Sequence, residues 1–450
     1  MFDKILVANR GEIAVRIIRA CRTMGIKTVA IYSTADKHSL HVYLADESVC
    51  IGPAAVRESY LNIPAIIEAA KGTGCQAIHP GYGFLSEKST FAKQCAENGL
   101  VFIGPTPETI ERMGNKSQAR RSMMKAGVPV VPGTKDAVHS AEEALPVARQ
   151  IGWPIMIKAS SGGGGKGMRV SESIDDFTDM FNIAQRESVN AFGDNTVYLE
   201  RAVIDPRHVE VQIIGDTYGN VISLGERDCS IQRNHQKMIE ESPCPFLPEH
   251  IRKEMGEAAV RAAKAVEYLS AGTIEFLVDK EFNYYFMEMN TRIQVEHPVT
   301  EMVTNFDLVR EMIRVAAGEP LSVSQDDIRL SGHAIECRIN AEQPEKNFMP
   351  SPGTITQMHL PGGNGVRIDT AAFDGSTVPP FYDSMFAKLI VRGVDRKEAI
   401  AKMSAALEEM VIVGIHTNLD FQYAIMNNET FKEGREVNTG FIEKFLKGEL

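Results

Sequence analysis

The segment 273–300 constrains the fold most strongly, because it places charged side chains directly on apolar strands. Two runs rich in β-branched and aromatic residues, 273–278 and 283–289, flank a short connection, which predicts a β-hairpin. Alternation places Glu275 on one face of the first strand. On the second strand it groups Tyr284, Phe286, Glu288 and Asn290 on one face. In-register pairing would therefore bring Glu275 and Glu288 together.

Two neighbouring carboxylates repel each other unless a cation or a shared proton intervenes. Oxygen-only ligands suit a hard ion such as Mg²⁺, and the Asn290 amide lies beside the two carboxylates. A dense polar cluster follows at once, made of Arg292, Gln294, Glu296 and His297. A solvated hairpin end with surface ion pairs is the alternative for any single residue. This alternative fits the whole group poorly, because burying a charge without a partner costs much free energy.

Composition limits the class of protein. A chain of 450 residues is long enough for two to four domains. The 48 basic and 59 acidic residues give a net charge of −11, which disfavours nonspecific nucleic-acid binding. Seven scattered cysteines without a Cys-x-x-Cys pair favour reduced thiols in the cytoplasm over a disulfide framework or structural zinc. No signal peptide and no apolar run of membrane-spanning length is expected.

The first hundred residues alternate strands and helices, which is typical of a parallel α/β sheet covered on both faces. The first strand is followed by Asn9-Arg10-Gly11-Glu12, which lacks the glycine spacing of a dinucleotide fingerprint. Nicotinamide binding is therefore disfavoured. Residues 108–126 are expected to form one long basic helix. The proline-punctuated connector 128–133 is a plausible boundary.

A glycine run, 162–165, follows the predicted strand 154–159. Glycines expose backbone N–H groups and let the chain approach a phosphate closely. Lys158 and Lys166 flank the run with positive charge, although its spacing is not that of a Walker A loop. A flexible hairpin tip is the alternative. We infer a mobile lid that closes over nucleotide phosphates.

The second half of the chain is expected to carry a larger sheet, beginning with the strand 209–214. Residues 226–237 form a charge-dense strand and loop, in which Cys229 is a passive thiol and His235 is either structural or a ligand. Helices are expected over 249–268 and 307–317. A last unit then begins near Ser331, with strands 333–340, 353–360, 365–369 and 388–392 and a closing helix 396–410.

Six motifs carry a resemblance to a known family: 8–14 (ANRGEIA), 79–87 (HPGYGFLSE), Lys158 with the glycine run, 226–230 (ERDCS), 288–298 (EMNTRIQVEHP) and 332–342 (GHAIECRINAE). The chain resembles the ATP-grasp superfamily and, within it, the biotin carboxylases, over essentially its whole length. The resemblance implies a mixed α/β and α+β fold. It implies a Rossmann-like parallel-sheet domain (1–112), a small ATP-grasp subdomain with the lid (113–203), a large ATP-grasp subdomain (204–330) and a C-terminal mixed-sheet domain (331–450).

The resemblance also implies site roles. The nucleotide ligands would be Lys116, Lys158, Gly164, Gly165, Glu200, Val203, His208, Gln232, His235, Glu275, Leu277 and Glu288. Mg²⁺ or Mn²⁺ would be held by Glu275, Glu288 and Asn290. Bicarbonate would be held by Lys237, Arg292, Gln294 and Val295. Glu296 matches the general base, and Arg338 matches the residue that stabilises the biotin enolate. The implied reaction carboxylates biotin with ATP and bicarbonate through carboxyphosphate.

No Met-Lys-Met biotinylation motif and no carboxyltransferase-sized extension occurs. Biotin is therefore expected on a separate carrier protein, with separate carboxyltransferase subunits and a homodimeric enzyme. The favoured context is acetyl-CoA carboxylase, which makes malonyl-CoA for fatty acid synthesis. Three alternatives stay open: the equivalent subunit of a split pyruvate or propionyl-CoA carboxylase, another ATP-grasp ligase that uses an amine, and a catalytically silent nucleotide-binding scaffold.

Overall fold

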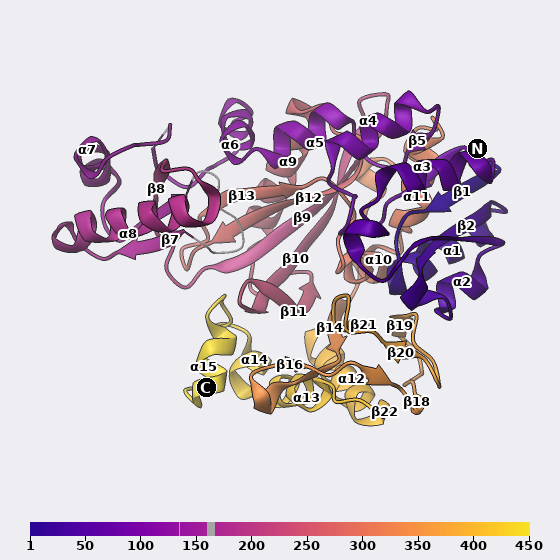
Figure 1. The fold of residues 1–450 in the computed structure, drawn as a ribbon. Coiled ribbons are helices and arrows are strands. Elements are labelled where there is room, and N and C mark those ends of the chain that lie inside the picture. Colours follow the sequence, from indigo (N-terminus) through magenta and orange to yellow (C-terminus); the bar gives the residue numbers. More distant parts are fainter. Residues whose placement is uncertain (135, 160–166) are drawn as a thin grey trace.

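The computed structural model describes residues 1–134, 136–159 and 167–450. The predicted lid residues Gly164, Gly165 and Lys166 lie outside the described residues. In Figure 1 the N-terminal sheet lies at the right, and a small sheet with α7 and α8 lies at the left. The C-terminal strands and helices lie at the bottom, with β9, β12 and β13 between these parts.

The N-terminal part contains a parallel five-stranded sheet in the order β3-β2-β1-β4-β5. Because successive strand residues point to opposite faces, Ile5 and Val7 join the apolar cluster of α1, whereas Leu6 joins that of α3 and α4. Both faces are therefore covered, which confirms the predicted architecture. The elements are β1 (Lys4–Val7), α1 (Gly11–Thr23), β2 (Lys27–Ser33), α2 (Leu40–Leu44), β3 (Glu47–Gly52), α3 (Ile63–Gly72), β4 (Ala77–His79), α4 (Ser89–Glu97) and β5 (Val101–Phe102).

The single long helix predicted over 108–126 is wrong. The segment forms two helices, α5 (Pro107–Gly114) and α6 (Lys116–Lys125), separated by Asn115 in an extended conformation (φ −91°, ψ 108°). The Asn115 Oδ1 accepts a hydrogen bond from the Gln118 N–H at 3.0 Å and so caps α6. The break places Lys116 in the first turn of α6.

A small antiparallel sheet, in the order β7-β6-β8, follows. Its strands are β6 (Ile155–Ala159), β7 (Met168–Ser171) and β8 (Val197–Arg201), with helices α7 (Ala141–Ile151) and α8 (Ile174–Phe192). Ile155, Phe177, Phe181 and Leu199 form the centre of its own apolar cluster. This unit carries Lys158 and Glu200 on adjacent strands.

The largest element is an eight-stranded antiparallel sheet in the order β13-β12-β9-β10-β11-β14-β21-β19. Its apolar face packs on α9, where Val209, Val211 and Phe276 meet Met255 and Ala259. The sheet continues past residue 331, because β14 pairs with β11. Its strands are β9 (Arg207–Gly215), β10 (Val221–Arg233), β11 (Gln236–Ser242), β12 (Ser270–Val278), β13 (Tyr284–Asn290), β14 (His333–Asn340), β19 (Val366–Thr370) and β21 (Met385–Gly393), and its adjacent helices are α9 (Glu249–Ala265), α10 (His297–Thr304) and α11 (Leu308–Ala316).

The hairpin of β12 and β13 is confirmed, but the predicted face of Tyr284 and Phe286 is wrong. Glu275 pairs with Glu288, yet the next pair is Phe276 with Phe286, so Met287 is an extra residue in β13. Such a β-bulge reverses the alternation. Phe286 therefore packs in the apolar cluster with Phe276, whereas Glu288 stays opposite Glu275.

The C-terminal region adds short strands and helices below the sheet (Figure 1). The strand predicted over 353–360 is two strands with different partners, because β17 pairs with β20 and β18 pairs with β22. Three helices also follow the predicted closing helix α12. The elements are β15 (Glu342–Gln343), β16 (Met349–Pro350), β17 (Gly353–Thr354), β18 (Gln357–His359), β20 (Thr377–Val378), α12 (Arg396–Glu409), β22 (Val411–Val413), α13 (Leu419–Asn427), α14 (Glu429–Glu433) and α15 (Phe441–Lys447).

Four short 3₁₀ turns complete the described structure, at Thr34–Asp36, Val56–Glu58, Gln325–Asp327 and Pro344–Lys346. Among the residues that the structure describes, no helix combines the length and the apolar character that crossing a membrane requires.

Candidate functional site

Four charged residues form a row across the polar face of the large sheet. Glu288 pairs with Glu275, Glu275 pairs with Glu210, and Glu210 pairs with Arg227, on four adjacent strands. Glu210 and Arg227 are fully buried, and their side chains form an ion pair. Like charges directly opposite each other destabilise a sheet, so three adjacent carboxylates require further cations.

Lys237 from β11 supplies one of these cations. Its Nζ lies 2.6 Å from Glu210 Oε2, 2.9 Å from Glu275 Oε1 and 2.6 Å from Glu296 Oε1. Burial lowers the pKa of Lys237, but the three carboxylates outweigh burial and raise it well above its usual range. The ammonium group therefore stays charged and holds three strands and the segment after the hairpin together.

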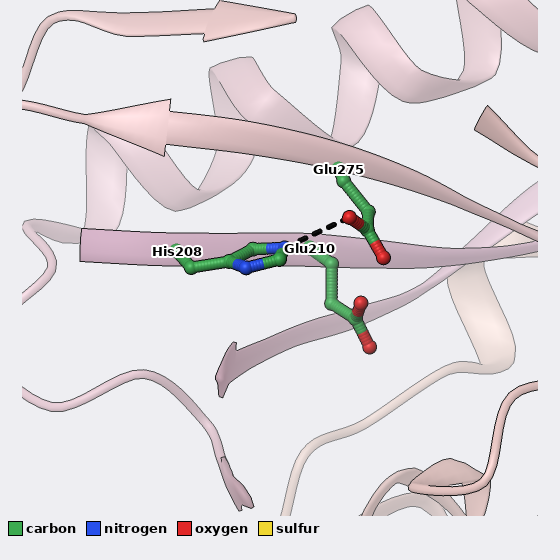
Figure 2. A group of neighbouring side chains, drawn as sticks. All are labelled: His208, Glu210 and Glu275. Atoms are coloured by element: carbon green, nitrogen blue, oxygen red, sulfur yellow. Dashed lines mark ion pairs between the residues drawn. The ribbon is translucent and has the colours of Figure 1, made fainter. Parts of the chain in front are cut away.

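His208 is the second residue that contacts the Glu275 carboxylate. Figure 2 shows His208 and Glu210 projecting from the same strand, β9, toward Glu275 of the adjacent strand. The His208 Nε2 lies 3.0 Å from Glu275 Oε2. Burial raises the pKa of Glu275, but Lys237 and His208 outweigh this effect and hold it well below its usual range. Glu275 is therefore ionised at neutral pH.

Glu296 is held from two sides by cations. It is fully buried, its Oε1 contacts Lys237, and its Oε2 accepts a hydrogen bond from Arg338 Nη2 at 3.0 Å. Burial raises the pKa of Glu296, but Lys237, Arg338 and Arg227 hold it well below its usual range. Arg338 in turn donates from Nε to Glu240 Oε1 at 2.7 Å. The predicted general base Glu296 and the predicted enolate-stabilising Arg338 thus lie in one ionic network with Lys237.

Arg292 lies at the edge of the same network. Its Nη1 donates to Gln294 Oε1 at 2.7 Å, and its Nη2 donates to Asn290 Oδ1 at 3.1 Å. Asn290 and Gln294 both donate to Glu275 Oε1, at 2.8 and 3.1 Å. Glu87, from the N-terminal part, accepts from Arg292 Nε at 2.8 Å. The structure therefore brings together the predicted metal and bicarbonate residues.

The predicted nucleotide residues are more spread out. Lys158 pairs with Glu200, which also lies 3.3 Å from Arg120 Nη1. Leu277 pairs with His208 across the strands, and Gln232 Nε2 lies 3.5 Å from His208 Nδ1.

Two further residues of that set, Val203 and His235, have other surroundings. Val203 lines a cavity of about 240 Å³ beside Trp153 and Tyr285. His235 lies exposed in the two-residue turn between β10 and β11, where Asn234 and His235 both have positive φ. The contacts of the described residues do not test the predicted ligand role of His235, which stays a prediction.

The sequence prediction missed four charged residues of the network: the buried Glu210, Arg227 and Glu240, and the exposed Glu87. A local signal existed for Glu210, because a charged residue interrupts the apolar strand β9. Arg227 and Glu240 become visible only when the cross-strand pairing is known. Glu87 becomes visible only when its loop is placed beside Thr291 and Arg292.

The donor atoms fit the expected metal ion. Glu275, Glu288 and Asn290 offer oxygen atoms, which suit Mg²⁺ or Mn²⁺. Desolvation and repulsion by Glu275 raise the pKa of Glu288, and the positive charge of Lys116 opposes this rise. A cation between the two carboxylates would relieve the same repulsion. His208, Glu210 and Glu275 form a second group of potential ligands on the same face (Figure 2).

Protein-family models match nearly the whole chain. They are described as biotin carboxylase, N-terminal domain (residues 1–110), carbamoyl-phosphate synthase L chain, ATP binding domain (115–324), and biotin carboxylase C-terminal domain (336–444).

Individual relatives agree with these matches. The chain is 56% identical to biotin carboxylase 1 of Bacillus subtilis, covering 99% of each chain. It is 52% identical to a pyruvate carboxylase subunit of Methanothermobacter thermautotrophicus, covering 100% of this chain and 91% of the relative. Among solved structures, it superposes with a TM-score of 0.92 on the biotin carboxylase domain dimer of Hydrogenobacter thermophilus 2-oxoglutarate carboxylase, in complex with MgADP, ADP and bicarbonate (47% identity, 99% and 98% coverage).

Proposed function

Because the chain belongs to the biotin carboxylase family, we propose that it carboxylates biotin on a separate carrier protein, using ATP and bicarbonate. It is a ligase that forms a C–N bond. Bicarbonate oxygen attacks the γ-phosphorus of ATP, and ADP leaves, giving carboxyphosphate. Carboxyphosphate breaks into CO₂ and phosphate, phosphate takes the N1′ proton of biotin, and N1′ captures the CO₂. The observation that carries the proposal is the convergence of Lys237 and Arg338 on the buried carboxylate of Glu296.

We assign Lys237, Arg292, Gln294 and Val295 to bicarbonate. An anion beside Lys237 and Arg292 gains electrostatic stabilisation in a site with little water. Arg292 already has its guanidinium oriented by Glu87, Gln294 and Asn290, so little ordering is needed when bicarbonate binds.

Glu296 is assigned as the general base that removes the bicarbonate proton. A carboxylate with a strongly lowered pKa is a weak base while Lys237 and Arg338 hold it. Bicarbonate that draws Lys237 away, and biotin that draws Arg338 away, would raise the pKa of Glu296. Proton removal is thereby coupled to the presence of both substrates. Arg338, released from Glu296, then stabilises the enolate oxygen of biotin.

The nucleotide is assigned to Lys116, Lys158, Glu200, Val203, His208, Gln232 and Leu277, with Gly164, Gly165 and His235 as further ligands. Glu275, Glu288 and Asn290 would hold Mg²⁺ or Mn²⁺. When bound, the ion neutralises charge on the phosphates and helps to align the transferred phosphoryl group. Lys237 and His208 now partner Glu275, so both are expected to shift when the metal and nucleotide bind.

The division of the chain into domains at 112/113, 203/204 and 330/331 remains our proposal. The physiological context is proposed to be acetyl-CoA carboxylase in the cytoplasm, with a biotin carrier, carboxyltransferase subunits and a homodimeric enzyme. All seven cysteines are free, as reduced thiols are in that compartment. The equivalent subunit of a pyruvate carboxylase is the second candidate, since one similar relative bears that name.

The test is ADP release by the purified protein with Mg·ATP and bicarbonate, with and without free biotin. We expect release that biotin stimulates and that bicarbonate removal abolishes. Release that is indifferent to biotin would contradict the proposal and point to another ATP-grasp ligase. An amine would then be the next substrate to try.

A further inference from the structure

Lys388 of β21 is a fully buried lysine next to the bicarbonate segment. Its Nζ donates a hydrogen bond to the Val295 carbonyl oxygen at 2.8 Å and lies 3.1 Å from Glu12 Oε1. Burial lowers the pKa of Lys388, but Glu12, Glu336 and Asp369 outweigh it, so the group stays charged. Neither Lys388 nor Glu12 belongs to the site described above.

Glu12 connects Lys388 to the N-terminal part of the molecule. It lies in the first turn of α1, and its Oε1 accepts a hydrogen bond from the Tyr82 hydroxyl. Tyr82 precedes Glu87 in the same loop, and Glu87 accepts from the Thr291 N–H at 3.1 Å as well as from Arg292. The segment that carries Arg292, Val295 and Glu296 is therefore held near both of its ends by groups that reach it from other parts of the chain.

The Lys388 contact acts on a peptide group rather than on a side chain. The carbonyl of Val295 and the N–H of Glu296 lie in one planar peptide unit. A donor fixed at the Val295 oxygen therefore fixes the plane from which the Glu296 side chain departs. A buried ion pair adds little net stability compared with apolar side chains of similar size, so stability alone does not account for Lys388 and Glu12.

We propose that Lys388, held by Glu12, is a positioning residue that orients the Val295–Glu296 peptide and so aims the Glu296 carboxylate at bicarbonate. This proposal rests on the proposed function, in which Glu296 is the base. Misplacing a reacting group by about 1 Å can lower a rate about 100-fold. The effect is therefore expected on kcat, while nucleotide binding on the far side of the network stays unchanged.

The test compares three proteins: the unchanged enzyme, Lys388→Met, and the double variant Lys388→Met with Glu12→Gln. The single variant leaves Glu12 without its cation, whereas the double variant removes both charges. If the pair only balances charge, the double variant regains full activity. If Lys388 orients Glu296, the double variant regains thermal stability but keeps a kcat lowered at least about tenfold. Its ADP affinity is expected to stay within about threefold.

The unchanged enzyme is measured first. If it shows no biotin-dependent ADP release, the proposed function is rejected, and the positioning role of Lys388 is not what failed. Given an active enzyme, a double variant with unchanged kcat overturns the positioning role. If the double variant does not fold, Glu12→Asp tests the same positioning role of Lys388. It withdraws the carboxylate from Lys388 by one methylene, so a lowered kcat supports the role and an unchanged kcat overturns it.

Discussion

Lys237 Nζ and Glu296 Oε1 lie 2.6 Å apart inside a largely buried network that also contains Arg338. The same lysine reaches Glu210 and Glu275, so the group assigned to the metal and the group assigned to proton removal share one cation. Any ligand that displaces Lys237 changes the charge balance at both places. This sharing explains how binding of one substrate can prepare the site for the next.

Glu296→Gln removes the assigned base and keeps the shape of the side chain. We expect kcat for biotin-dependent ADP release to fall about 100- to 10,000-fold, with ADP binding retained. Cys229→Ser is the matched control, because Cys229 Sγ lies 3.9 Å from Glu296 Oε1 but has no assigned role. Steady-state kinetics of both variants checks the prediction. Full turnover by Glu296→Gln would remove Glu296 from the mechanism.

Glu87→Gln weakens the ion pair that orients Arg292. Glu87 is more than one-third exposed, so solvent screens the pair and the effect is modest. We expect the bicarbonate KM to rise about two- to fivefold, with kcat for ADP release nearly unchanged. Glu97→Gln, on the exposed side of α4, is the control. An equal change in both variants would show that the position of Glu87 has no special effect.

Met287 is the extra residue of the bulge in β13, and the bulge absorbs it between the pairs Phe276–Phe286 and Glu275–Glu288. Deleting Met287 makes Phe286 and Glu288 neighbours, so regular alternation keeps Phe286 in the apolar cluster and Glu288 opposite Glu275. We expect Mg·ATP-dependent turnover to be largely retained. Deleting Glu281, in the turn between the strands, also shortens the hairpin by one residue and should likewise keep most activity. Loss of turnover in the Met287 deletion alone would show that the bulge itself sets the position of Glu288.

Glu241→Gln tests a buried carboxylate outside the site. Burial raises the pKa of Glu241, but Arg396 and His333 outweigh burial and lower it to about 2. Because this value lies below that of an unfolded glutamate, the stabilisation is fully present above about pH 4.5 and is lost as the pH falls toward 2. The variant is expected to be destabilised by about 3 kcal/mol at pH 7 and by less at pH 4. Thermal unfolding midpoints of the unchanged enzyme and the variant at pH 7 and pH 4 measure the difference in stability. A difference that is not smaller at pH 4 would contradict the stabilising role of ionised Glu241.

Glu240→Gln, one residue earlier, should show the opposite pH dependence. Burial raises the pKa of Glu240 to about 7, against the effect of Arg338. The folded protein therefore holds a proton that the unfolded chain releases, and this contribution to stability is lost as the pH rises from about 4.5 to 7. Glutamine mimics the protonated form, so the variant should gain thermal stability relative to the unchanged enzyme as the pH rises through this range. A difference in thermal midpoint between the variant and the unchanged enzyme that is the same at all pH values would contradict the prediction.

Local patterns predicted the elements that carry the site. Alternation gave the hairpin and the pairing of Glu275 with Glu288, because the period of a strand is a local property. The parallel N-terminal sheet followed from the regular alternation of strands and helices. The motifs 288–298 and 332–342 gave Glu296 and Arg338, which the structure brings within 3.0 Å.

The remaining features depend on contacts between distant segments. The bulge at Met287 leaves no clear mark in the alternation, and Asn115 breaks a helix that residue preferences alone would continue. The contact of Lys388 with Val295 exists because β21 joins the large sheet through β14, 93 residues along the chain from the segment it supports. No local pattern specifies such pairing.

The most direct test of the central claim is transfer of label from ¹⁴C-bicarbonate to biotin in the presence of Mg·ATP. The account predicts acid-labile labelled carboxybiotin, formed in proportion to ADP by the unchanged enzyme and lost in Glu296→Gln. ADP release without labelled biotin, or equal labelling in both proteins, would contradict it.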